Sequence, residues 1–358
     1  MDINRERLIQ TFLTLVQIDS ESGEEQEIIA YLKKEMDDLG FKTDIDKIGN
    51  LICSNDPNPK LMLAAHTDTV KPGKGIKPII EGNIIKTDGT TILGADNKSG
   101  VSAILEILTS IKENGLKVEL EVVFTVKEEI GPIGSSNLDF TKLKAKQSIN
   151  LDSKPGDIVS NEPSLMHFDI EITGKAAHSG TRPENGINAI QIAAKAISKL
   201  KLGRIDFETT SNVGLINGGM ARNIIPEKVT LEAEVRSRND KKFEFYTKKL
   251  IETFKETALK YGGTIDIQAN LRGKAYKHQE TDPMVKLLVE CGRQNGIKYN
   301  FTSTGGLTDA NIFNRHGIKC ITTGASGNDY HTTREYLEID KFVIGTKIIL
   351  DAIIELTK

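Results

Sequence analysis

The first half of the chain alternates between helical and strand-like hydrophobic patterns. Apolar side chains recur at helical spacing between residues 28 and 39, and Gly40 follows as a typical C-terminal stop. The apolar run at residues 61–65 is short and uninterrupted, which predicts a strand buried on both faces of a sheet. Further elements are predicted as a helix at residues 100–112 and strands at 118–126 and 148–151.

The pattern changes after about Pro163. The predicted order becomes strand, helix, strand, strand, helix, strand, at residues 168–173, 187–200, 210–216, 229–235, 241–261 and 264–271. This is the order of a split βαβ, ferredoxin-like unit. After Arg272 the α/β pattern returns and ends in a helix at residues 341–356. We therefore expect an α/β/α sandwich of mixed sheet, residues 1–163 and 273–358, with a ferredoxin-like α+β domain inserted at residues 164–272.

Composition and charge narrow the classes of function. A chain of 358 residues favours two domains over one. Its 47 basic and 50 acidic side chains give a net charge of −3 without a basic stripe, so we expect no nucleic-acid partner. No apolar run approaches the ~20 residues of a membrane span, and the early acids Asp2 and Glu6 argue against a secretory signal. The three cysteines form no Cys-x-x-Cys pair, so we expect buried thiols in a cytoplasmic protein.

Candidate metal ligands follow the predicted strands, one or two at the end of each. The carboxyl edge of the strands is where open α/β sheets place their sites. A further acid, Asp96, lies in the polar loop 94–100 that opens the next helix. The full set is His66, Asp68, Asp96, Glu128, Glu129, Asp152 and, much later, His331.

Each of these signals alone has an ordinary structural interpretation. His66 with Asp68 is also typical of a surface turn, and Asp96 is a common type of helix N-cap. Glu128 and Glu129 are also typical of two solvated acids before a turn. In the functional interpretation, a histidine binds a metal through one ring nitrogen while a carboxylate accepts a hydrogen bond from the other. A carboxylate also has two oxygens and can bridge two cations.

Taken together and in order, the motifs resemble a known family. The chain contains His-x-Asp, Gly-Ala-Asp-x-Lys-x-Gly, Glu-Glu, Asp and a distal His, at residues 66–68, 94–100, 128–129, 152 and 331. This series is similar to the co-catalytic metallopeptidases that include peptidase T, glutamate carboxypeptidase and the aminoacylases. Further matching segments are residues 20–24, 174–180, 218–226 and 304–311. The resemblance covers nearly the whole chain and is greatest to peptidase T-like enzymes.

The resemblance implies a pair of divalent metal ions and a role for each candidate. One ion would be bound by His66 and Asp152, the other by Glu129 and His331, and Asp96 would bridge both. Asp68 would orient His66, and Glu128 would be the general base that takes a proton from the attacking water. Mixed histidine and carboxylate ligands suit zinc, with cobalt or manganese as alternatives.

The inserted domain would meet a small peptide substrate. By resemblance, His178 would stabilise the oxyanion of the reaction, and Asn223 and Arg236 would hold a carbonyl or carboxylate of the substrate. Arg236 has an equally good interpretation as a surface charge at a strand end. In several relatives the histidine that corresponds to His178 comes from a partner subunit. We therefore expect the inserted domain to act as a lid over the site and to form a homodimer.

Two positions depart from the family pattern. Asn97 stands where many relatives have a second Asp, but that position is not a ligand, so the metal site is retained. Asp152 stands where carboxypeptidases of the family tend to have Glu, which favours an aminopeptidase or tripeptidase.

Several alternatives remain at this point. An N-acyl amino acid deacylase or a carboxypeptidase would use the same scaffold. A catalytically silent metal-binding protein is disfavoured because Glu128 and all the predicted ligands are present. A dinucleotide-binding enzyme is disfavoured because no Gly-x-Gly-x-x-Gly follows the first strand.

Overall fold

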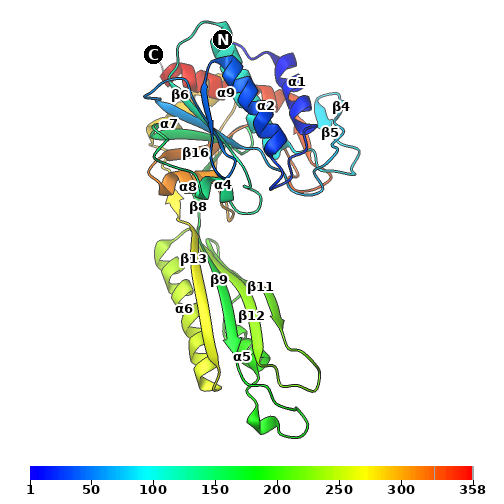
Figure 1. Cartoon of the computed structure of the whole chain (residues 1–358). Helices are drawn as coiled ribbons and strands as arrows, with labels where there is room; N and C mark the ends of the chain where they lie inside the picture. The colour runs from blue at the N-terminus through cyan, green and yellow to red at the C-terminus, as the bar shows by residue number, and fades with distance from the viewer. Residues whose placement is uncertain (326, 357–358) are drawn as a thin grey trace. The chain divides into compact units, whose positions relative to one another are not determined.

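The computed structural model describes residues 1–325 and 327–356, and its internal contacts divide the chain into two units (Figure 1). Unit 1 comprises Met1–Ser160, Lys277–Ser303 and Leu307–Lys358. Unit 2 comprises Asn161–Tyr276 together with Thr304–Gly306. Unit 2 therefore extends three residues before and four residues after the predicted insertion 164–272, and it includes a short later segment that the sequence did not indicate.

A nine-stranded mixed sheet forms the centre of unit 1. Its order is β1-β2-β6-β3-β7-β16-β8-β14, with β15 pairing β8. The strands are β1 (Lys42–Ile45), β2 (Leu51–Ser54), β3 (Leu61–His66), β6 (Leu120–Thr125), β7 (Gln147–Leu151), β8 (Asp157–Glu162), β14 (Tyr276–Lys277), β15 (Asn300–Ser303) and β16 (Lys319–Thr323). The central strands β6, β3, β7 and β16 are parallel, whereas β2 and β8 join them antiparallel.

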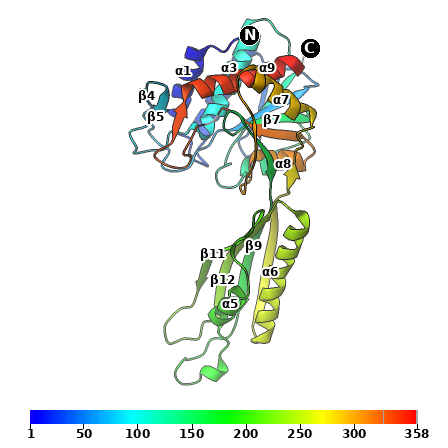
Figure 2. The same ribbon diagram turned by 180° about the vertical axis from the view of Figure 1, so that it is seen from behind.

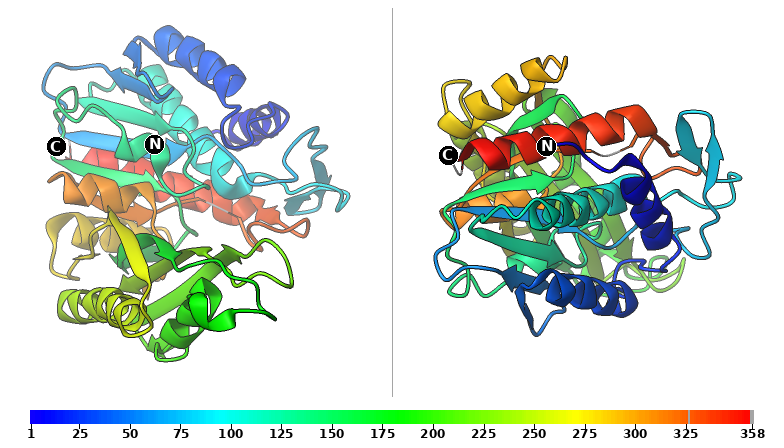
Figure 3. Two further views of the ribbon diagram at one scale, coloured as in Figure 1. Left: turned by 60° about the horizontal axis from the view of Figure 1, so that its bottom comes forward. Right: turned by 90° about the horizontal axis from the view of Figure 1, so that it is seen from above.

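Helices cover both faces of this sheet. Every residue of β3 is buried, as the apolar run predicts, and its side chains alternate between two layers. Leu61, Leu63 and Ala65 join the core made with α1 (Arg5–Val16), α2 (Gln26–Leu39), α3 (Ala95–Glu113), α7 (Pro283–Gln294) and α9 (Ile339–Leu356). Helices α4 (Ile133–Ser136) and α8 (Asp309–Arg315) lie on the other side of the sheet (Figures 1 and 2), and Figure 3 (right) views unit 1 from the α1, α2 and α9 side. The predicted α/β/α class is confirmed.

The start of α3 differs from the helix predicted at residues 100–112. The helical assignment begins at Ala95, but Asp96 (φ −86°, ψ 102°) and Asn97 (φ −125°, ψ 33°) do not have helical backbone angles. The Asn97 side-chain oxygen accepts a hydrogen bond from the Gly100 amide (3.2 Å), which is a capping interaction. The polar loop is thus folded into the first turn, and Asp96 lies in an irregular stretch.

A separate three-stranded sheet in unit 1 joins distant parts of the chain. Its order is β17 (Tyr336–Glu338), β5 (Ile84–Lys86) and β4 (Ile79–Glu81), all antiparallel. Tyr336 pairs with Lys86, so the segment that carries His331 is fixed to the segment that precedes α3.

Unit 2 has the predicted ferredoxin-like order. Its sheet is β10-β11-β12-β9-β13, formed by β9 (Ser164–Thr173), β10 (Gly203–Asp206), β11 (Thr209–Gly218), β12 (Lys228–Ser237) and β13 (Thr264–Gly273). The short edge strand β10 is an addition to the predicted pattern. Helices α5 (Ala189–Ile197) and α6 (Asp240–Lys260) pack on one face, and Phe168, Ile170 and Ile172 of β9 join their core (Figure 2).

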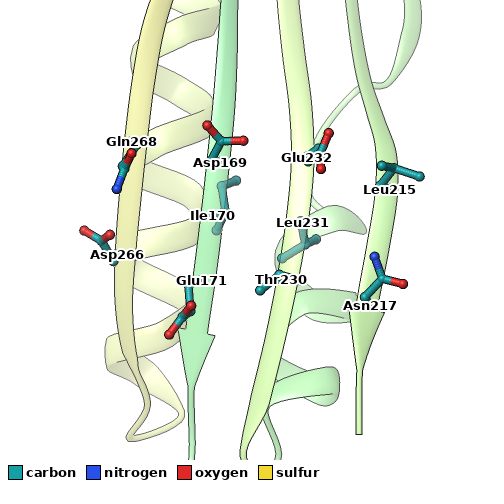
Figure 4. Close-up of a pocket in the computed structure, with 10 residues that line it drawn as sticks. All are labelled: Asp169, Ile170, Glu171, Leu215, Asn217, Thr230, Leu231, Glu232, Asp266 and Gln268. Carbon is teal, nitrogen blue, oxygen red and sulfur yellow. The ribbon is translucent and has the colours of Figure 1, made fainter.

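The other face of the unit 2 sheet is open and acidic. Asp169 and Glu171 alternate with the core residues of β9, and they line a shallow hollow of about 250 Å³ together with Glu232 and Asp266 (Figure 4). None of the site residues predicted from the sequence lines this hollow.

Two expectations from composition can be compared with the structure. In the described ranges, no helix combines the length and the apolar character of a membrane span. Cys53, Cys291 and Cys320 are buried, as expected, and Cys53 and Cys291 are free thiols. Burial raises the pKa of the Cys53 thiol far above its usual range and that of Cys291 to about 11, so neither is suited to act as a nucleophile.

Candidate active site

The parallel register of the central strands brings the predicted ligands together. His66 is the last residue of β3 and lies opposite Thr125, the last residue of β6. Glu128 and Glu129 therefore follow at the same edge of the sheet. Asp152 directly follows β7, and its amide donates to the Thr323 carbonyl at the end of β16 (2.9 Å). The side chains predicted from strand ends thus meet at the carboxyl edge, within unit 1.

Asp96 lies between the two histidines. Its Oδ1 is 3.1 Å from Nε2 of His66, and its Oδ2 is 3.4 Å from Nε2 of His331. On the first side, His66 Nε2 is also 3.6 Å from Oδ1 of Asp152. On the second side, His331 Nε2 is 2.9 Å from Oε2 of Glu129. One carboxylate therefore belongs to two sets of side chains, each with its own histidine and its own second acid.

Three residues at or beside these proposed ligands have left-handed backbone angles without being glycine. Lys127 has φ 56° and precedes the Glu128–Glu129 pair, Asp329 has φ 54°, and His331 itself has φ 59°. Such angles cost free energy and persist where the surrounding structure imposes them, most often at functional sites. Here they turn the chain so that neither acid of the pair is a solvated surface residue: Glu128 is 9% exposed and the Glu129 side chain 5%.

Asp68 is fully buried and holds three parts of the site at once. Its Oδ1 is 3.4 Å from Nδ1 of His66 and accepts a hydrogen bond from the Glu128 amide (2.9 Å). Its Oδ2 accepts from the Ser22 hydroxyl (2.6 Å) and from the Glu129 amide (3.1 Å). Asp68 is therefore placed both to orient the imidazole and to fix the backbone of the Glu128–Glu129 pair.

The charges of this cluster are unbalanced. Five carboxylates, those of Asp68, Asp96, Glu128, Glu129 and Asp152, face only two histidines. Burial raises the pKa of Asp152 to about 7 and, with further acids nearby, that of Glu128 well above its usual range. Positive charge at the centre of the cluster would lower both values, because it favours the ionised acids.

The neighbouring acids favour the protonated form of both histidines. Burial disfavours a charged His66, but hydrogen bonds to Asp152, Asp68 and Asp96 outweigh burial and raise its pKa well above the usual range. Hydrogen bonds to Asp96 and Glu129 raise the pKa of His331 to about 10. The two rings therefore supply part of the positive charge that the acids require.

The donor atoms fit divalent metal ions. Ligand atoms of His66, Asp96 and Glu129, which come from both sets, all lie within 4.8 Å of one another. Imidazole nitrogens and carboxylate oxygens are typical ligands of zinc, and Asp152 beside His66 and His331 beside Glu129 are close enough to complete the two sets. Because the Asp96 oxygens face opposite sets, the arrangement provides two adjacent positions that share one carboxylate.

The three predicted substrate-binding residues all lie in unit 2 but are not together there. His178 and Asn223 are neighbours, since the Ser179 amide donates to the Asn223 carbonyl (3.0 Å). Arg236 lies near the other end of the ten-residue strand β12, which is about 30 Å long. Its guanidinium binds Glu234 through two nitrogens (2.9 and 3.0 Å) and donates to the Gly305 carbonyl (3.0 Å).

His178 is exposed and its ring has a defined orientation. Nδ1 accepts hydrogen bonds from the amides of Gly180 (3.1 Å) and Thr181 (3.2 Å). In the neutral ring the proton must then be on Nε2, which is left to donate to another group. This is the form that a donor to an oxyanion requires.

Comparisons with known proteins identify the family of this chain. Residues 162–262 match the peptidase dimerisation domain of the M20 family, and residues 79–163 match the M42 glutamyl aminopeptidase family. The structure of aminopeptidase PepT from Bacillus cereus is 37% identical to this chain, with 99% of this chain and 100% of that chain covered and a TM-score of 0.90. The chain belongs to the peptidase T-like M20 metallopeptidases.

Two further relatives extend the comparison. A tripeptidase structure from Staphylococcus aureus is 37% identical, with 99% and 98% coverage and a TM-score of 0.91. Carboxypeptidase G2 of a Pseudomonas strain is 28% identical over 96% of this chain and 89% of its own length. The family resemblance expected from the sequence is therefore confirmed, and with it the expectation of a peptidase T-like metallopeptidase.

Sequence reasoning missed several residues of this M20 site. Ser22 lies in a segment that carried the resemblance, but its bond to Asp68 spans 46 residues. Asp309, also in a matching segment, is buried and accepts a hydrogen bond from the Thr125 hydroxyl. Glu335 is 1% exposed and accepts from three backbone amides of the loop before α3. Burial raises the pKa of Glu335 to about 7, while these donors favour its ionised form.

Metal binding to this peptidase should release protons. A metal ion takes the lone pair of a neutral imidazole, whereas neighbouring acids raise the pKa of His66 well above its usual range and that of His331 to about 10 before loading. We therefore expect loading at pH 7 to displace one proton from the His331 ring and one from any His66 ring that is protonated, and metal affinity to increase as pH rises from 6 towards 10. Calorimetry in two buffers of different ionisation enthalpy measures this release.

A matched control is His178→Ala in unit 2, which should leave the number of released protons unchanged. Equal heats of metal binding in the two buffers would contradict the assignment of His66 and His331 as ligands.

Proposed function

We propose that this protein is a two-metal exopeptidase that cleaves the first peptide bond of tripeptides with a free N-terminus. The observation that carries the proposal is the position of Asp96, whose two oxygens lie 3.1 and 3.4 Å from two different histidines. A pair of metal ions in such an arrangement polarises the scissile carbonyl and lowers the pKa of the attacking water. Zinc is the metal we propose, because the donors are imidazole nitrogens and carboxylate oxygens.

Each residue of the cluster has a defined part in this proposal. His66 and Asp152 hold one ion, Glu129 and His331 hold the other, and Asp96 is shared. Asp68 keeps the His66 ring oriented through Nδ1 and fixes the backbone at Glu128.

Glu128 is the general base of the proposed reaction. It lies at the strand-end edge among the ligands, yet no hydrogen bond links its carboxylate to either histidine in the described part of the chain. Its pKa is raised by burial, with Asp152, Asp309 and Glu129 adding to the effect, so its carboxylate readily accepts a proton. Glu128 would take a proton from the water and deliver it to the leaving amine.

The preference for a free N-terminus rests on two observations. The acid after β7 is Asp152, where carboxypeptidases of the family tend to have Glu. The two 37% identical structures are described as an aminopeptidase and a tripeptidase. The second candidate is a carboxypeptidase, which the more distant likeness to carboxypeptidase G2 favours.

Unit 2 would complete the substrate site and form a homodimer. The family match to a dimerisation domain supports this, as do exposed apolar side chains along and after β11, namely Leu215, Ile216 and Met220. His178 would donate from Nε2 to the oxyanion, and Asn223 and Arg236 would bind polar groups of the peptide. Because Cys53 and Cys291 are buried and form no disulfide, we also propose a cytoplasmic location.

Replacing Glu128 should separate catalysis from metal binding. Glu128→Gln keeps the side-chain shape but cannot hold a proton as a base, so kcat should fall by about 100-fold or more while both metal ions remain bound. Glu119→Gln, on the half-exposed side chain before β6, is the matched control and should keep normal turnover. Near-normal kcat in Glu128→Gln would remove Glu128 as the base.

The substrate class is tested with one tripeptide made of three different residues, used either with a free N-terminus or N-acetylated. Cleavage of each form is measured on protein stripped of metal by a chelator and again after zinc is added back. We expect zinc-dependent cleavage of the free peptide alone, with mass spectrometry showing release of its first residue. Release of the last residue would instead identify a carboxypeptidase, and removal of the acetyl group a deacylase. Absence of cleavage in every arm would contradict the proposed activity.

A further inference from the structure

Glu335 is a buried acid that lies outside the predicted ligand set. Its Oε2 accepts hydrogen bonds from the amides of Leu93 (2.9 Å) and Gly94 (2.8 Å), and its Oε1 accepts from the amide of Asp96 (3.0 Å). These three donors belong to one short loop, and the acid that binds them comes from 239 or more positions later in the chain. One carboxylate therefore holds the backbone on both sides of the point where α3 starts.

The loop needs such a partner because its backbone is irregular. Gly94 has φ +73°, and Asp96 has ψ 102°, so the regular helical hydrogen bonds do not fix the position of Asp96. Amides at the start of a helix have no partner within that helix and must find one elsewhere. A carboxylate at this place satisfies three of them and is favoured by the helix dipole.

Glu335 also belongs to the loop that carries the second histidine. It closes the loop that carries His331: its amide donates to the Thr332 carbonyl (3.1 Å), and the next residue, Tyr336, exchanges backbone hydrogen bonds with Asn328 (2.8 and 3.1 Å). Within this closed loop His331 takes its left-handed backbone angle. Glu335 thus joins the backbone of one proposed ligand, Asp96, to the loop of another.

A buried lysine follows in the same segment. Lys98 is fully buried, and its Nζ donates to the Ile18 carbonyl (2.6 Å). Burial lowers the pKa of Lys98 to about 8, and the negative charges of Asp19 and Glu335 oppose this effect. The segment that presents Asp96 is therefore also anchored, through the Ile18 carbonyl, to the segment that directly follows α1.

We propose that Glu335 is a positioning residue that sets the orientation of Asp96 relative to His331 and so controls the affinity of both metal ions. The proposal rests on the two-metal site of the proposed function. Because Asp96 is shared, a small rotation of its backbone moves both oxygens away from their ions together. A side chain that positions a metal ligand through its backbone contributes as such outer contacts usually do, about 10- to 100-fold in metal affinity.

Glu335→Gln tests this, because the amide keeps the size of the side chain but replaces one acceptor oxygen by a donor that faces backbone N–H groups. Zinc affinity is measured by competition with a chromophoric chelator at a temperature well below unfolding. We expect both ions to bind about 10- to 100-fold more weakly. At saturating zinc, KM for the tripeptide should be unchanged, because Glu335 does not contact the substrate.

The matched control is Glu338→Gln, three residues later on a partly exposed side chain, and it should bind zinc within twofold of the wild type.

Two further measurements keep the outcome unambiguous. Glu335→Asp keeps the charge with a shorter reach and should have intermediate zinc affinity, and its cobalt-substituted form should show an altered visible spectrum. The Glu335→Asp variant also takes the place of Glu335→Gln in the zinc measurement if Glu335→Gln does not fold. Wild-type zinc affinity at both positions in a folded Glu335 variant would overturn the proposal, even if thermal stability falls. If the wild-type protein itself binds fewer than two ions, the proposed function fails and this inference with it.

Discussion

The shared carboxylate of Asp96 is the interaction on which the rest of the site depends. Its two oxygens face His66 and His331, which come from segments 265 positions apart in the sequence. Each histidine then has its own second acid, so the site has two halves that meet at one side chain. An excess of buried acids is unfavourable unless positive charge is added or some acids are protonated, since buried like charges repel and buried carboxylates lose their solvation. We propose that metal ions supply that charge at the point where the two halves meet.

Backbone amides hold the acids that surround this centre. Asp68 accepts from the amides of Glu128 and Glu129, and Glu335 accepts from the amide of Asp96 and two amides before it. In both cases a buried carboxylate fixes the main chain of a residue proposed as a metal ligand or as the general base. The side chain of that residue remains available to bind metal or to accept a proton. The geometry therefore depends on the fold as a whole, because these bonds join β3, the loop after β6, the loop before α3 and the segment before β17.

The grouping of the proposed ligands could be predicted from the sequence because of where these residues lie. His66, Asp152 and the Glu128–Glu129 pair directly follow apolar runs, and parallel pairing of those runs aligns their ends. The ferredoxin-like order of unit 2 was equally visible, since its strands alternate between core and open face. The roles of Asp68 towards the backbone and of Glu335 were not visible, because their partners are main-chain groups 60 and 239 positions away. Local spacing carries no information on such contacts. The ion pair between Arg236 and Glu234 could have been predicted, because residues two apart on a strand share a face.

Anomalous diffraction from crystals of the zinc-loaded protein shows whether Asp96 lies between two metal ions. We expect two anomalous peaks ~3.5–4 Å apart. One peak should lie beside His66 and Asp152, the other beside Glu129 and His331, with the Asp96 carboxylate between them. A single peak, or two peaks that do not share Asp96, would show that Asp96 does not bridge a pair of metal ions.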